Sequence, residues 1–131
     1  MVVYVWRGVV ESERAIKAET KMSKRIPMKI RAILREAKRS LQRIYGKRLK
    51  RVILHGSYAR GEATDGSDID LIIVLQKMDD PVAELERISK EIHRIDFEHD
   101  TLISVIPIDV NQHRTGRLPL VLNARREGVT V

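Results

Sequence analysis

Asp68 and Asp70 stand one residue apart at the start of an apolar run that extends to Leu75. On a strand, alternate side chains leave the same face, so the two carboxylates would be about 6.6 Å apart along one face. Two carboxylates against an apolar sheet repel each other and are costly to desolvate without a cation. Magnesium would resolve this conflict, because it prefers oxygen ligands and tolerates few protein ligands beside substrate phosphates. The alternative is a solvent-exposed strand start, where Ser67 and Asp68 only close a turn.

The dipeptide Gly56-Ser57 directly follows the apolar segment 51–55. Glycine lets the backbone approach a phosphate closely, and a serine at a strand-to-helix junction offers a hydroxyl and an N–H at the positive end of the next helix. An ordinary turn with a capping serine is the competing interpretation, and Gly61 and Gly66 alone would be turn residues. The combination of strand, Gly-Ser, further glycine and paired aspartates opening a second strand is more specific than any of its parts.

Together, Gly56-Ser57, Gly61 and the segment Ser67–Leu71 resemble the signature of the DNA polymerase beta-type nucleotidyltransferase superfamily. The string Gly-Ser-Tyr-Ala-Arg-Gly and the small size are similar to its minimal nucleotidyltransferase branch. The resemblance is strong over residues 51–75 and extends over about residues 29–131. It does not cover the first two dozen residues.

The resemblance implies a small α/β (α+β) fold, in which a mixed sheet carries helices mainly on one face. It also implies two magnesium ions at Asp68 and Asp70. A third carboxylate normally projects from a later strand beside the pair. Asp100, at the opening of a strand over residues 101–108, is preferred for that place over Asp109, which follows the core of the same strand.

The implied reaction is nucleotidyl transfer, with ATP as co-substrate and pyrophosphate as leaving product. Asp68, Asp70 and Asp100 would hold the metal, and Asp100 would also help to deprotonate the incoming hydroxyl. The residues expected to bind the nucleotide are Gly56, Ser57, Arg60 and Ser67. The alternative for Arg60 is the more common one, that it is an exposed arginine of a helix and binds no phosphate.

A protein partner is also implied, because stand-alone proteins of the minimal branch are typically antitoxins of two-gene modules. The partner would be a HEPN-domain ribonuclease toxin, inactivated by adenylylation of a tyrosine and by binding. The basic helix 28–50 or the C-terminal tail is expected to dock it. Two other functions remain open: an inactive module that sequesters its partner, and a nucleic-acid-binding or RNA-modifying protein.

Composition narrows the possible functions. The chain has 131 residues, a net charge of +7 and no cysteine, which excludes disulfides, a thiolate nucleophile and Cys-based metal sites. Residues 1–50 hold 15 of the 25 Lys and Arg, which suggests a basic surface that meets nucleic acid or an acidic partner. Aromatic residues for base stacking are few. No apolar stretch approaches the roughly 18 to 20 residues that span a bilayer, and a cytoplasmic protein is expected.

Hydrophobic spacing predicts the elements that must position the motif. Apolar residues at three- and four-residue steps predict an amphipathic helix from Pro27 to Gly46 and a second helix from Pro81. Apolar runs and short periodic segments predict strands at 51–55, 68–75, 101–108 and 128–131, and a short helix at 118–126. A single domain is therefore expected over residues 26–131, with an N-terminal extension of residues 1–25.

Overall fold

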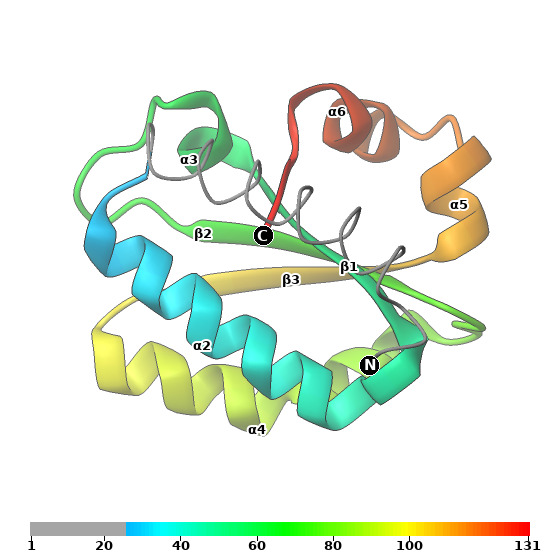
Figure 1. Cartoon of the computed structure of the whole chain (residues 1–131), viewed down its shortest axis with the longest axis horizontal. Helices are drawn as coiled ribbons and strands as arrows, with labels where there is room; N and C mark the ends of the chain where they lie inside the picture. The colour runs from blue at the N-terminus through cyan, green and yellow to red at the C-terminus, as the bar shows by residue number, and fades with distance from the viewer. Residues whose placement is uncertain (1–25) are drawn as a thin grey trace, which may run out of the picture.

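The computed structural model describes residues 26–131, so the expected extension over residues 1–25 lies outside the described residues. The elements, in chain order, are α2 (Met28–Tyr45), the 3₁₀ helix η2 (Gly46–Arg48), β1 (Leu49–His55), α3 (Gly56–Arg60), β2 (Ile69–Leu75), α4 (Pro81–His99), β3 (Ile103–Asp109), α5 (Val110–Thr115), α6 (Pro119–Glu127) and β4 (Val129–Thr130) (Figure 1). Among these helices, none is long and apolar enough to cross a membrane.

Four strands form one mixed sheet in the order β3–β2–β1–β4. Strand β1 runs antiparallel to both β2 and β4, whereas β2 and β3 are parallel. A parallel pair needs a long crossover connection, and helix α4 provides it. The small mixed α/β sheet expected from the sequence is confirmed.

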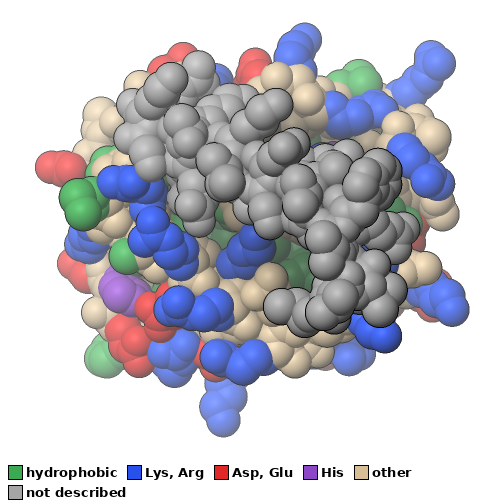
Figure 2. Space-filling view, in the orientation of Figure 1, with side chains coloured by type: hydrophobic (Ala, Val, Ile, Leu, Met, Phe, Trp, Pro, Cys, Tyr) green, Lys and Arg blue, Asp and Glu red, His purple; other side chains and the backbone are tan. Residues whose placement is uncertain are grey.

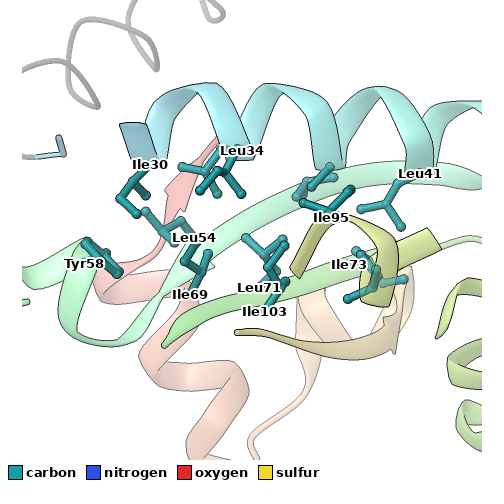
Figure 3. Packing of buried hydrophobic residues seen from close by; sticks show 14 of the residues in the cluster. Ile30, Leu34, Leu41, Leu54, Tyr58, Ile69, Leu71, Ile73, Ile95 and Ile103 are labelled. Carbon is teal, nitrogen blue, oxygen red and sulfur yellow. The ribbon is translucent and has the colours of Figure 1, made fainter. Parts of the chain in front are cut away.

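Each face of the sheet has its own hydrophobic cluster, because side chains alternate along the strands. Leu71 and Ile73 belong to a large cluster under the two long helices, α2 and α4. Figure 3 shows the side chains of α2 meeting those of β1 and β2 in this cluster. Ile72 and Val74 point the other way, into a smaller cluster that includes Val121 of α6. The long helices therefore cover one face, as expected, and the short helices α5 and α6 lie along the other (Figure 1).

Local sequence signals explain where the long helices begin and end. Helix α2 follows Pro27 and ends at Gly46, whose φ of 54° lies in the left-handed region that suits glycine. Helix α4 begins with Pro81 in its first turn, and the Asp80 carboxylate accepts the N–H of Val82 at 3.0 Å. Both helix starts agree with the predicted positions.

Helix α5 has no counterpart among the elements expected from the sequence. Asp109 caps it, because its carboxylate accepts the N–H of Asn111 at 2.8 Å. The same carboxylate accepts the N–H of Met78 at 3.1 Å, which ties the end of β3 to the turn after β2. Six residues contain too few apolar positions to establish a helical period, so spacing does not reveal this helix.

Candidate active site

The paired aspartates lie where β2 begins, at the end of the sheet where β1 finishes. Asp70 is in register with His55 of β1 and with Ser104 of β3. All three side chains lie on the face that carries α6, because each is two residues from a member of the smaller hydrophobic cluster or of its border. Asp68 directly precedes the strand and is exposed, whereas Asp70 is half-buried. The sheet therefore presents a polar row beside an apolar cluster.

Gly56 lies directly against the carboxylate of Asp70. A Cβ placed on Gly56 would be 2.3 Å from Oδ2 of Asp70, and the glycine has a φ of +74°. The backbone conformation therefore strains any side chain at this position, and a side chain would also displace the Asp70 carboxylate. The glycine leaves a cradle in which the backbone at the start of α3 approaches the carboxylate.

Neither Asp68 nor Asp70 makes a hydrogen bond or an ion pair within residues 26–131. The nearest titratable neighbour across the strands is His55, and burial lowers its pKa, although the charge of Asp70 acts in the opposite direction. Its Nε2 is buried without a hydrogen-bond partner. A neutral imidazole provides no counter-charge to the two aspartates.

Arg60, on the last turn of α3, interacts electrostatically with Asp70, but it also forms ion pairs with two glutamates. Its Nε is 2.9 Å from Oε2 of Glu62, and its Nη1 is 4.0 Å from Oε2 of Glu127 on α6. The hydrogen bond to Glu62 raises its pKa, whereas Asp70 is the weakest contributor. The aspartates thus keep negative charge and free oxygen atoms. These are the ligands that magnesium prefers, so Asp68 and Asp70 fit such an ion.

The two candidates for a third carboxylate lie at opposite ends of the sheet. Asp109 is in register with Leu75, five residues beyond Asp70 and about 17 Å away along the strand. Asp100 lies at the aspartates' end of the sheet and is exposed. The expectation that it opens the strand is wrong, because α4 continues to His99 and a left-handed turn at Asp100, with φ 49°, delays β3 to Ile103.

The β3 residue in register with Asp70 is Ser104, which sequence reasoning missed. Its side chain is exposed on the same face as Asp70. A hydroxyl can donate a hydrogen bond to a carboxylate or phosphate oxygen and can accept one as well. The signal that could have found it is a single polar residue interrupting the apolar run Ile103–Ile108.

The two serines expected to bind a nucleotide have different surroundings. The hydroxyl of Ser57, in the first turn of α3, makes no hydrogen bond to the described part of the chain. By contrast, Ser67 Oγ accepts the N–H of Thr64 at 2.9 Å, and the N–H of Ser67 donates to the Thr64 carbonyl at 3.0 Å. Ser57 is therefore available beside the aspartates, whereas Ser67 holds the turn that leads into β2.

A second acidic group lies outside this motif, between α2 and α4. Glu36, Glu98 and His99 place ligand-type atoms within 4.8 Å of one another. However, the Nη1 of Arg94 is 3.2 Å from Glu36 and 2.9 Å from Glu98, and Nε2 of His99 is 2.7 Å from Glu36. Arg94 and His99 already contact these carboxylates, so the group is an ion-pair network that joins two helices.

Comparison with known proteins identifies a family and two curated relatives. Residues 34–123 match the family model described as a nucleotidyltransferase domain. A protein of Methanocaldococcus jannaschii named a putative protein adenylyltransferase is 39% identical over 79 residues, which cover 60% of this chain and 79% of the relative. A second protein with that name, from the same organism, is 49% identical over 41 residues, or 31% of this chain and 41% of its own length.

Two solved structures have similar folds. A chain from a toxin–antitoxin crystal structure with AMP-PNP superposes with a TM-score of 0.52 at 20% identity, covering 72% of this chain and 68% of its own length. A putative nucleotidyltransferase from Sulfolobus solfataricus gives a TM-score of 0.51 at 23% identity and covers 89% of this chain and 85% of its own length. At these identities the likeness concerns the fold alone.

Proposed function

The chain belongs to the nucleotidyltransferase domain family, and from this premise we propose that it transfers AMP from ATP to a hydroxyl group of a partner protein. The observation that carries the proposal is that neither Asp68 nor Asp70 has a hydrogen-bond or ion-pair partner within residues 26–131, while Gly56 lies against the Asp70 carboxylate. The names of the two Methanocaldococcus relatives, both protein adenylyltransferases, support AMP as the transferred group and protein as the acceptor.

In the proposed reaction, the acceptor oxygen forms a bond to the α-phosphorus of ATP. The bond from that phosphorus to the oxygen bridging it to the β-phosphorus breaks, so pyrophosphate leaves and the hydroxyl proton passes to a base. Magnesium, when held by Asp68 and Asp70, supplies positive charge that balances the triphosphate. The free hydroxyl of Ser57 and the backbone at Gly56 are placed to contact the outer phosphates.

Two further residues complete the proposed site. Asp100 is kept as the third carboxylate and as the group that receives the hydroxyl proton, because Asp109 lies at the other end of the sheet. Ser104 is proposed to donate its hydroxyl hydrogen to Asp70 or to a phosphate oxygen, since it is in register with Asp70 on the same face. Arg60 can turn from Glu62 toward the phosphates, because that ion pair is largely exposed.

The proposed acceptor is a tyrosine hydroxyl of a HEPN-domain toxin. The motif over residues 51–75 resembles the minimal nucleotidyltransferase branch, whose stand-alone members are antitoxins. A fold neighbour comes from a toxin–antitoxin crystallised with AMP-PNP, an ATP analogue, which supports the same kind of partner and nucleotide.

The test is label transfer in an extract of the source cells with magnesium, comparing ATP labelled at the α-phosphate with ATP labelled at the γ-phosphate. We expect a protein to be labelled from the α-phosphate alone, with mass spectrometry locating AMP on a tyrosine. Asp70→Asn should lower the rate by about 10³-fold, since the charge stabilisation lost is several kcal/mol. Glu98→Gln, the same change on the opposite face, should leave the rate unchanged. Transfer from the γ-phosphate, or full activity in Asp70→Asn, would contradict the proposal.

A second candidate is a module that binds its partner without transferring AMP. The specific observation in its favour is Ser104, because a hydroxyl stands where a third carboxylate would be in register with Asp70. The same experiment separates the two functions. A binding module would form a stable complex with the partner and give no α-label, and Asp70→Asn would bind the partner as well as the wild type.

A further inference from the structure

Five arginines on the side of the sheet that carries α5 and α6 have no acidic partner. None of them takes part in the ion pairs found among residues 26–131. Arg51 belongs to this side because it shares a strand face with Ile53 of the smaller cluster. The group, called the arginine face below, consists of Arg51, Arg114, Arg117, Arg125 and Arg126. Figure 2 shows Lys and Arg side chains at the upper right, where Figure 1 places α5 and α6, as well as others over the left and lower parts of the same view.

Helix α6 places two exposed leucines among these arginines. Leu118, at its N-terminal end, and Leu122 retain 60% and 44% of their accessible surface. With Arg126 they follow a four-residue spacing, so the three side chains lie in one stripe along the helix. Val121 and Ala124 point the other way and are buried against the sheet. The stripe therefore lies on the outward-facing side of α6, because the inner side of the helix is already packed against the sheet.

The surface around this stripe is held in place. Arg125 donates hydrogen bonds to the carbonyl of Arg114, at 2.8 Å, and to the carbonyl of Gly116, which fix the connection between α5 and α6. Burial lowers the pKa of His113, and the charges of Arg51 and Arg125 lower it further. The positive charge of this surface thus belongs to the arginines, which remain charged at any physiological pH.

An apolar centre surrounded by arginines has the composition of a protein-binding surface. Exposed leucines supply area that becomes buried, and guanidinium groups bind carboxylates through two parallel hydrogen bonds. Residues 110–131 contain no Phe, Tyr or Trp on which a base could stack. We propose that Leu118 and Leu122, with the arginine face, dock an acidic surface of the acceptor protein. This inference rests on the proposed function, since it assigns the partner of the same site.

The docking surface is close enough to the aspartates for one partner to reach both. Glu127, the residue after Arg126, is 4.0 Å from Arg60 on α3, and Arg60 interacts electrostatically with Asp70. The nine residues of α6 span about 13 Å. A partner surface of about 800 Å², the ordinary size for a specific complex, covers that length and still presents a hydroxyl to the site.

Charge reversal on α6 and on α2 tests the proposal against a matched control. The α6 variant is Arg117→Glu with Arg126→Glu, and the control is Arg35→Glu with Arg39→Glu, two exposed arginines of α2 with no ion pair. Both variants change the net charge equally. We expect the α6 variant to lose at least tenfold in the rate of protein labelling from α-labelled ATP, while its affinity for ATP stays within twofold of the wild type. Loss in the α2 control alone, or equal loss in both, would overturn the proposal.

A binding arm keeps the test independent of catalysis. Fluorescence anisotropy would compare a 20-residue helical peptide with Glu and Leu on one side, the same peptide with Gln for Glu, and a single-stranded RNA of equal charge. The α6 variant should lose at least tenfold in affinity for the Glu peptide, as Leu122→Ser should by a smaller factor. The proposal would be overturned if the RNA bound through α6 more tightly than the Glu peptide, or if the α6 variant bound the Glu peptide as well as the wild type does. Peptide binding through α6 without any protein labelling would contradict only the proposed function.

Discussion

The charged groups compared on the two faces of the sheet differ in whether they have partners within the fold. Between α2 and α4, Arg94 forms ion pairs with Glu36, Glu91 and Glu98 at once, so each of these carboxylates has a partner within the fold. On the face that carries α6, Asp70 has no hydrogen-bond partner in the described chain. Charges satisfied within the fold stabilise it, whereas charges left without partners are available to an ion, a nucleotide or another protein. This difference is why we propose the functional site on the α6 face.

The hydrophobic clusters follow the same division. The larger cluster is enclosed between the sheet and two long helices, whereas the smaller one lies under the short helices α5 and α6. The face that carries the aspartates therefore has less apolar area to hold its helices. We interpret the α2–α4 face as the source of most of the stability, on which the site of the opposite face is built.

Leu71→Ala and Ile72→Ala separate the two clusters, because these adjacent residues of β2 are fully buried on opposite faces. We expect Leu71→Ala to lower the free energy of unfolding by about 4 kcal/mol and Ile72→Ala by about 2 to 3 kcal/mol. The reason is that a cavity between two long helices collapses less readily than one under the short α6. Urea denaturation measures both, and a larger loss in Ile72→Ala would reverse the comparison.

Gly56→Ala and Gly61→Ala separate the effect of backbone strain from the effect of contact with Asp70. Both glycines have left-handed φ values, +74° and +73°, but a Cβ on Gly61 meets nothing within 4 Å, whereas on Gly56 it meets Asp70. Gly61→Ala should lower the free energy of unfolding by about 1 kcal/mol, from backbone strain alone. Gly56→Ala should cost about 2 to 3 kcal/mol and remove AMP transfer. Equal effects on stability and transfer would show that Gly56 serves only as a turn.

Glu36→Gln tests the paired charges of the α2–α4 face. The hydrogen bond from His99 lowers the pKa of Glu36, and Arg94 lowers it too, so the unfolded chain binds more protons at this residue. The stability it contributes is present above its ordinary pKa of 4.5 and is lost as pH falls through the folded value. At pH 7 the free energy of unfolding of the wild type should be higher than that of Glu36→Gln by less than about 1 kcal/mol. Urea denaturation of both proteins at a series of pH values should show this difference in unfolding free energy disappearing between pH 7 and pH 3. A difference that stays constant over this range would show that the Glu36 ion pair is not its cause.

Periodic features of the sequence were sufficient to predict most of the fold. The stripe of apolar residues in α2, with Gly46 at its end, gave the helix within one residue of each boundary. The aspartate pair could be placed on a strand because its period of two is a local property. The start of β3 could not be predicted, since it depends on the left-handed turn at Asp100 and on the hydrogen bond from the N–H of Ile103 to the Asp96 carboxylate, at 2.9 Å.

Features that depend on pairing between distant strands were missed. Ser104 gains its position from its register with Asp70, and one residue of shift would turn it to the other face. The closeness of Gly56 to Asp70 likewise follows from the antiparallel pairing of β1 with β2. Sequence composition showed an excess of basic residues, but only the fold shows which arginines have acidic partners.

The central claim is that the metal and nucleotide bind at the aspartates and not at the acidic group between α2 and α4. Manganese, which can replace magnesium and broadens nearby NMR signals, would be added with ATP to the wild type, to Asp68→Asn with Asp70→Asn, and to Glu36→Gln with Glu98→Gln. Broadening of the amides of His55, Gly56 and Ser104, lost only in the aspartate variant, is the predicted result. Broadening around Glu36 and His99 that persists in the aspartate variant would contradict the account.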